Sequence, residues 1–295
     1  MHTWLQNTLD RLEESPKCDF AVNGPGASEP SALAALALAD YGKGKSTERV
    51  GEFLRTLQYT EGHIGMRSKE PEPHWPTSLA LLVWKRLDPN TYARPIQMAL
   101  AWALSISGAR FEIDPTERNH NSMLAAWPWV EGTYSWMEPS AFFAIALKAH
   151  GLHDHTRTKE ALALLVDRLL PDGGCNYGST YVLGQLLRPQ VQPSGIVALA
   201  LAGEKDESGR LDRTLSYLLK ACIFETTPNS LCWAILGLAA HDRIPSNKEE
   251  LLAKAYEKAI KRGGSPYTLA LLANAALGDR SFLIQKSVVS GGNTN

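Results

Sequence analysis

Pro30-Ser31-Ala32-Leu33-Ala34-Ala35-Leu36-Ala37-Leu38-Ala39 is the stretch that decides the fold. A proline opens it, serine follows, and the rest is apolar on every side. Similar openings recur at intervals of 35 to 63 residues, at Pro30, Pro76, Pro139, Pro193, Pro228 and Pro266. Proline suits the first position of a helix, where its missing N–H costs nothing. A helix without a polar stripe must be buried all round, so the pattern predicts six inner helices.

The segments between these openings are apolar on one side only. In 248–261, Leu251, Ala255 and Ala259 share a row, while lysines and glutamates occupy the rest of the surface. Similar one-sided segments are 3–14, 47–58, 90–105, 157–170 and 210–221. Six outer helices alternating with six inner ones predict an all-α, (α/α)6 toroid. We expect one domain over 1–295, with the helix at 3–14 beside the last repeat and no strand or hairpin.

Composition narrows the classes of protein that fit. Thirty basic and thirty-one acidic residues leave a formal charge of −1, without the basic face that nucleic-acid binding needs. The four cysteines form no CxxC pair, which predicts a reduced, cytoplasmic compartment. No apolar run approaches the ~20 residues of a membrane span. We therefore expect a soluble protein, with peripheral membrane contact and oligomeric state left open.

Two further motifs carry a family resemblance. One is Phe53-Leu54-x-x-x-Gln58-x-x-x-Gly62, and the other is the run 164–178, which contains Pro171-Asp172-Gly173-Gly174-Cys175-Asn176-Tyr177-Gly178. With the six openings they resemble the repeat of squalene–hopene cyclases and of protein prenyltransferase β subunits. The resemblance implies the toroid fold, an apolar, isoprenoid-like small molecule as partner, and a reactive centre at the N-terminal end of the inner helices.

The catalytic signatures of that family are missing. The sequence has neither an Asp-x-Asp-Asp run nor an Asp-Asp-x-x-Asp motif. Where the family's zinc motif has a cysteine, Glu131-Gly132-Thr133-Tyr134 has a threonine, which cannot replace a thiolate ligand. We therefore predict no metal and no cofactor.

The candidate site is the end of the ring where the six inner helices begin. Converging helix N-termini attract anions, and aromatic faces suit either carbocations or sugars. The long aromatic segment 107–137 is expected to be a partial lid. The candidate substrate-binding residues are Trp75, Trp127, Trp129, Trp136, Gln192, Asn229 and Tyr267.

Glu138 is the first candidate for catalysis, with Glu131 and Tyr134 named beside it. The residue before each proline is expected at the N-cap, where Ser, Thr, Asp and Asn are favoured. Glu29, Trp75, Glu138 and Gln192 depart from that preference. The helix dipole would keep Glu138 ionised, whereas full burial would raise its pKa and make it a proton donor.

Other polar groups are expected to be solvated. His150, His153, Asp154 and His155 lie at the opposite end of an inner helix, where metal binding is the less favoured interpretation. Arg118, His120, Arg67 and Arg110 belong to loops or to the surface.

Three functions fit this sequence. The first is an isoprenoid-handling protein, with cyclase-like or prenyl-transfer chemistry if it is an enzyme, marked by a carboxylate buried in an apolar cavity. The second is a non-catalytic lipid-binding or scaffold toroid, marked by a cavity filled by its own tryptophans. The third is a glycan-active toroid enzyme using Tyr134, His120 and Arg118, marked by an open, wet groove.

Overall fold

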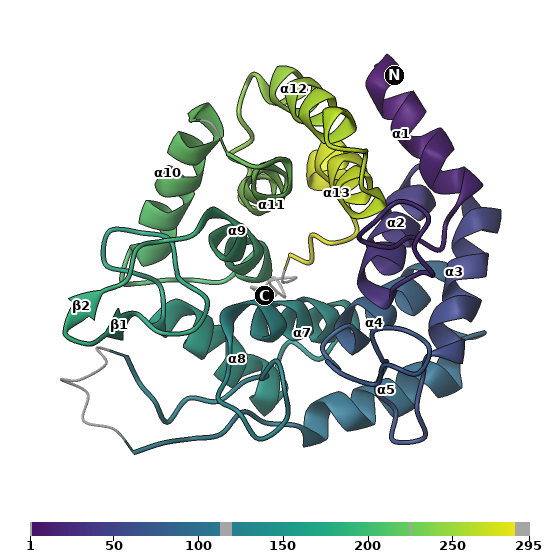
Figure 1. Cartoon of the computed structure of the whole chain (residues 1–295). Coiled ribbons are helices and arrows are strands. Elements are labelled where there is room, and N and C mark those ends of the chain that lie inside the picture. Colours follow the sequence, from purple (N-terminus) through teal and green to yellow (C-terminus); the bar gives the residue numbers. More distant parts are fainter. Residues whose placement is uncertain (1, 113–119, 225, 287–295) are drawn as a thin grey trace, which may run out of the picture.

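A computed structural model describes residues 2–112, 120–224 and 226–286, and it confirms the toroid. Six inner helices form a closed ring, and six outer helices surround it (Figure 1). The inner helices are α2 (Ser28–Asp40), α4 (Thr77–Leu87), α7 (Met137–Ala149), α9 (Val191–Ala200), α11 (Pro228–Ala239) and α13 (Pro266–Leu277). The outer helices are α1 (Thr3–Glu14), α3 (Gly44–Thr56), α5 (Ala93–Ser105), α8 (Thr156–Asp167), α10 (Arg210–Ile223) and α12 (Lys248–Lys261). A short 3₁₀ helix, η1 (Gly278–Arg280), follows α13.

Alanine and leucine make the inner ring possible. Every residue of α2 from Ser28 to Leu38 is buried, as is every residue of α7 from Met137 to Leu147. Small alanines let neighbouring helices approach closely, and leucines fill the space between them. Each inner helix therefore touches two inner neighbours and is covered outside by the amphipathic layer.

The ring closes where α13 meets α2, as expected from the repeat. The Asn274 side-chain amide of α13 donates to the carbonyl of Leu33 in α2 over 2.8 Å. Helix α1 packs beside α13, and the ring of Trp4 lies 5.9 Å from that of Tyr256 in α12. Chain segments more than 200 residues apart thus share one core.

Three inner helices begin earlier than the sequence predicts. In α2, α7 and α9 the proline is the third helical residue, and the N-caps are Ala27, Trp136 and Gln190. The first-turn N–H groups have no partner within the helix, so proline is tolerated at any of these positions. The expected N-cap positions of Glu29, Glu138 and Gln192 are therefore wrong, because all three lie at the second helical position, inside the first turn. Thr227 and Ser265 do occupy N-caps, as predicted.

The loops at this end of the ring differ in length. Long segments precede four inner helices (15–27, 57–76, 106–136 and 168–190), whereas only 224–227 and 262–265 precede α11 and α13. The segment before α9 contains a hairpin that the sequence did not predict, β1 (Tyr181–Val182) with β2 (Gln185–Leu186). Each strand has only two residues, too few to show an alternating pattern.

Helices α9 and α11 touch backbone to backbone through Gly195. A Cβ at Gly195 would lie 2.5 Å from the carbonyl carbon and oxygen of Trp233. We expect Gly195→Ala to lower the free energy of unfolding by about 1–3 kcal/mol, because the two helices must separate. Urea denaturation measures this. The control is Gly44→Ala at the start of α3, where a Cβ would meet nothing within 4 Å and stability should be unchanged or slightly raised. Equal stabilities of the two variants would contradict the close α9–α11 contact.

Candidate functional site

A cavity of about 290 Å³, which we call the mouth cavity, lies where the first turns of the inner helices converge. Its walls combine aromatic, apolar and carboxyl side chains, and its volume is at the small end for ligand pockets. The lining residues are Phe20, Glu29, Trp75, Trp129, Glu138, Phe142, Gln192, Ile196 and Tyr267.

Two carboxyl groups line this cavity. Glu29 of α2 is 8% exposed and Glu138 of α7 is 6% exposed. Helices α2 and α7 flank α4, and Trp75 lies just before α4 begins. The ring therefore holds two acids on either side of an aromatic side chain.

Burial raises the pKa of Glu29 to about 8. A hydrogen bond with the Tyr267 hydroxyl acts the other way, and the charge of Glu138 raises the pKa further. Glu29 is near the N-terminus of α2, where the helix dipole favours the ionised form by at most ~1 kcal/mol. Loss of hydration outweighs the dipole, so Glu29 is mostly protonated at neutral pH.

Burial also raises the pKa of Glu138, to about 7, while a hydrogen bond from Gln192 opposes the shift. The Gln192 amide Nε2 donates to Glu138 Oε1 over 3.0 Å. Because the two acids interact, they titrate as a pair. The pair therefore releases one proton near pH 7 and the other near pH 8, because the charge left by the first proton raises the pKa of the group that still holds the second.

Aromatic rings make up much of the cavity lining. Trp75 stacks on Phe142 with ring centroids 5.2 Å apart and meets the edge of Trp129 at 5.3 Å. The ring of Phe142 also lies 5.5 Å from that of Trp233, which does not line the cavity. Flat faces beside polar groups suit a ligand with both apolar faces and hydroxyl edges.

The structure brings five of the predicted site residues to the cavity and leaves the other five outside it. Trp127 is fully buried in the core, and its indole N–H donates to the Ala103 carbonyl. Trp136 and Tyr134 stack on each other at 4.8 Å and do not line the cavity. Glu131 is exposed, and Asn229 accepts a hydrogen bond from Thr268. The five lining residues are Trp75, Trp129, Glu138, Gln192 and Tyr267.

The cavity also contains residues that the sequence did not single out as site residues. Glu29 holds the position before its proline that Glu138 and Gln192 hold before theirs, so the repeat itself contained the signal. Phe142 and Ile196 lie one turn further along α7 and α9 and look like core residues. Phe20 comes from an irregular loop, and no sequence signal marks it.

The remaining polar candidates have structural partners. His120 is 8% exposed, and its Nδ1 lies 3.2 Å from Thr180 Oγ1, so it is not solvated as expected. Arg118 lies outside the described residues. His153 Nε2 lies 3.2 Å from a Glu204 carboxylate oxygen, and His155 caps α8 by accepting from the N–H of Arg157.

Two surface arginines are also paired. Arg110 forms an ion pair with Glu160 at 2.6 Å, and Arg67 with Asp19 at 3.0 Å. In the described part of the chain, no group of three or more His, Cys, Asp or Glu side chains is placed to hold a metal ion. None of the described helices has the length and apolar character needed to cross a membrane.

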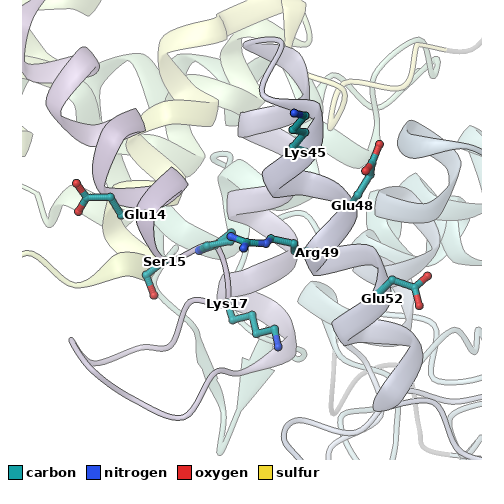
Figure 2. A pocket seen from close by; sticks show the side chains of 8 residues that line it. Glu14, Ser15, Lys17, Lys45, Glu48, Arg49 and Glu52 are labelled. Atoms are coloured by element: carbon teal, nitrogen blue, oxygen red, sulfur yellow. The ribbon is translucent and has the colours of Figure 1, made fainter.

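A larger groove of about 610 Å³ lies on the outer surface between the end of α1 and α3. Arg49 reaches from α3 toward Ser15 across it (Figure 2). Acidic and basic side chains mix there, and no aromatic residue lines it: the charged residues are Glu14, Lys17, Lys45, Glu48, Arg49 and Glu52. All six are exposed, so the groove lacks the buried carboxyl groups of the mouth cavity.

Comparison with known proteins identifies structural relatives only. No protein-family model matches the chain, and no curated protein matches it by sequence. An α-amylase from Clostridium perfringens superposes with a TM-score of 0.61 at 12% identity, over 95% of this chain and 98% of the amylase. A glycosidase variant gives 0.58 at 12% identity, over 96% and 97%. A GH8 protein from Teredinibacter turnerae, solved with xylobiose, gives 0.52 at 9% identity, over 95% of each chain.

These neighbours correct the family resemblance drawn from the sequence. They are glycosidases, so the expected kinship with squalene cyclases and prenyltransferases is wrong, as is the expected isoprenoid-like partner. Proline-led inner helices and Gly-Gly turns reflect how a toroid is built rather than what it binds. Gly173, for example, has φ +96°, and a Cβ there would lie 2.4 Å from the Arg213 backbone. At such low identity the neighbours establish the fold.

The raised pKa values predict a pH-dependent stability. Between pH 5 and 9 the native state holds protons on Glu29 and Glu138 that the unfolded chain has released, so the free energy of unfolding falls as pH rises. Glu29→Gln removes one such group and should gain stability relative to wild type on going from pH 5 to 9. At ~1.4 kcal/mol per pKa unit the gain is a few kcal/mol. Urea denaturation at both pH values measures it.

The matched control for this experiment is Glu131→Gln on the exposed surface. It should follow the wild-type pH dependence. A Glu29→Gln variant that does the same would show that the Glu29 carboxyl group is hydrated in solution.

Proposed function

We propose that this chain is a glycan-active enzyme that hydrolyses a glycosidic bond in the mouth cavity, with Glu29 as general acid and Glu138 as general base. The observation that carries the proposal is that two buried carboxyl groups with different pKa values line one aromatic cavity. Glycoside hydrolysis typically uses such a pair, one acid protonated and one ionised. The fold shared with three glycosidases supports the same choice.

The roles follow from the two pKa values. Near pH 7.5, between the values of about 7 and 8, Glu138 is largely ionised and Glu29 largely protonated. Glu29 gives its proton to the leaving oxygen as the bond to the anomeric carbon breaks. A water molecule adds to that carbon, and Glu138 takes the proton of the water. The Gln192 amide holds the Glu138 carboxylate through Oε1.

The cavity walls suit a sugar better than a hydrocarbon chain. Trp129 and Tyr267, which are half-buried, offer flat surfaces for the faces of a pyranose ring. Gln192 and the Tyr267 hydroxyl offer polar contacts to its edges. Gln192 already bonds to Glu138, and Tyr267 to Glu29. A wholly apolar ligand would still leave their remaining donor and acceptor positions unsatisfied, at a cost of about 1–3 kcal/mol for each buried group.

Kinetics of the two glutamine variants test the proposal. A printed glycan array probed with the inactive Glu29→Gln protein identifies the sugar, with xylo- and malto-oligosaccharides included because the similar structures are a xylobiose complex and an α-amylase. The wild type should show a bell-shaped pH profile with limbs near 7 and 8. Glu138→Gln should lower kcat by about 10²–10⁴-fold. Glu29→Gln should lose as much on natural glycosides but far less on 4-nitrophenyl glycosides, whose leaving group needs no proton.

Three results would contradict the proposal. They are full activity of Glu138→Gln, equal losses for Glu29→Gln on both kinds of glycoside, and a failure of every glycan on the array to bind. Circular dichroism of each variant verifies that the toroid is intact.

Trp129 is expected to contribute binding energy. It lines the cavity and is half-buried, so Trp129→Ala removes a large apolar contact worth ~1.5–3 kcal/mol. Affinity for the array-identified oligosaccharide should fall at least about tenfold in isothermal titration. Trp136→Ala is the control, because Trp136 is also half-buried but lies outside the cavity. Similar losses in both variants would place the ligand over the Trp136–Tyr134 pair instead.

A further inference from the structure

Two histidines pack against each other in the segment 57–76, which joins α3 to α4. The ring centroids of His63 and His74 are 4.1 Å apart. His63 also stacks on Tyr59 at 4.8 Å, and the ring of Trp102 in α5 lies 5.6 Å from each histidine. His63 is only 8% exposed. The pair therefore belongs to an aromatic cluster that leaves His63 little contact with water.

His63 fills this cluster without using its polar atoms. Both of its ring nitrogens are buried, and neither has a hydrogen-bond partner in the part of the chain that the structure describes. A neutral imidazole carries one donor and one acceptor, and leaving buried polar atoms unbonded is destabilising. A phenylalanine would fill the same space without this cost, so packing alone does not account for a histidine here.

The surroundings of the pair oppose a positive charge. Burial lowers the pKa of His63, and the charge of His74 lowers it further, while Glu61 and Glu131 act the other way. Burial also lowers the pKa of His74, against the charges of Glu72 and Glu131. All three glutamates are exposed, so solvent weakens their effect. The side chain that α5 contributes to the cluster is aromatic and carries no charge.

The packed pair therefore stabilises the fold only while both rings are neutral. An unfolded histidine has a pKa near 6.5, and the folded values lie below it. The stabilisation is complete above pH 6.5 and is lost as the pH falls through the lower folded values. This direction is opposite to that of the two buried glutamates of the mouth cavity, whose protonation stabilises the fold at low pH.

Hydrogen bonds connect the pair to the start of α4. The N–H of Ile64, the residue after His63, donates to the Thr77 hydroxyl over 2.8 Å. That hydroxyl donates to the carbonyl of His74 over 2.6 Å. Trp75 follows His74 directly and lines the mouth cavity. A displacement of either histidine ring is therefore transmitted to the backbone that carries Trp75.

We propose that the His63–His74 pair is an acid-sensitive switch that holds Trp75 in the mouth cavity only while both rings are neutral. A proton on either imidazole requires hydration that the cluster does not provide. The two rings then separate, segment 57–76 loosens, and Trp75 leaves the cavity. The neutral pair and the protonated pair thus favour two different arrangements of one segment.

Hydrogen exchange of the wild type at pH 7.5 and 5.0, corrected for the intrinsic effect of pH, tests the loosening. Protection of segment 57–76 should fall by about tenfold or more at pH 5.0. Helix α11 has no group that titrates in this range and should keep its protection. His63→Phe retains a flat ring beside Tyr59 and cannot take up a proton. Its protection in 57–76 should change by less than about twofold.

A second variant covers the case in which His63→Phe folds poorly. His74→Gln removes the like charge, so the pKa of His63 in an NMR titration should be below 6.5 in the wild type and higher in this variant. The loss of protection should then begin at a higher pH. His2→Gln, at an exposed position, is the control and should match the wild type.

The fluorescence of Trp75 tests the link to the cavity. Trp75 is 4% exposed, and its emission is the difference between the spectra of the wild type and Trp75→Phe. This difference should shift to longer wavelength at pH 5.0, as the indole becomes hydrated, and should not shift when His63 is also replaced by phenylalanine.

Unchanged protection of 57–76 in the wild type would overturn the switch, as would equal losses in the wild type and His63→Phe. A matching loss in α11 would show global unfolding and would also overturn it. An emission difference that does not shift would overturn the displacement of Trp75. Neither measurement requires a glycan, so these outcomes are independent of the proposed hydrolysis.

Discussion

Six helices that are apolar on every side can be buried only by one another and by an outer layer, and this constraint organises the whole chain. It forces the ring to close, so that Asn274 near the end of the sequence bonds to Leu33 near its start. It also removes polar side chains from most of the interior. The first turns of the inner helices are the exception, because their N–H groups have no partner within the helix and polar side chains can gather there.

The same constraint sets the chemistry of the carboxyl groups. On a surface helix, a glutamate in the first turn would be stabilised as an anion by the dipole. In this ring Glu29 and Glu138 are only 8% and 6% exposed. The cost of losing most of their hydration is larger than the dipole can offset. Raised pKa values of about 8 and 7 result from the packing. The packing of the first turns of the inner helices therefore provides both a cavity and two carboxyl groups that gain and lose protons near neutral pH.

The spacing of apolar residues predicted the fold almost completely. A helix that is apolar on all faces belongs to the inner ring, and one that is apolar on one face belongs to the outer layer. The sequence also predicted that Glu138, Gln192, Trp75, Trp129 and Tyr267 gather at the inner-helix N-termini, and these five line the cavity there. That this cavity binds the ligand stays a prediction. What the sequence missed depends on details that periodicity does not carry. Helices α2 and α7 begin two residues before their prolines. Proline is tolerated anywhere in the first turn, because the N–H groups there need no partner within the helix, so proline alone does not mark the first residue. Phe20 reaches the cavity through a loop anchored by Asp19 and Arg67, which lie 48 residues apart.

Family resemblance misled for a related physical reason. The motifs shared with terpenoid proteins are turns and helix starts, which describe the fold and do not determine the function. We had also expected a carboxyl group buried in an apolar cavity to indicate isoprenoid chemistry, but this feature alone does not distinguish an isoprenoid site from a sugar site. The cavity holds a second carboxyl group with a different pKa, a glutamine amide bonded to one acid and a tyrosine hydroxyl bonded to the other. These bonds leave other donor and acceptor positions of the same groups unused. When water leaves, those positions need polar partners, which the hydroxyls of a sugar can provide and a hydrocarbon cannot.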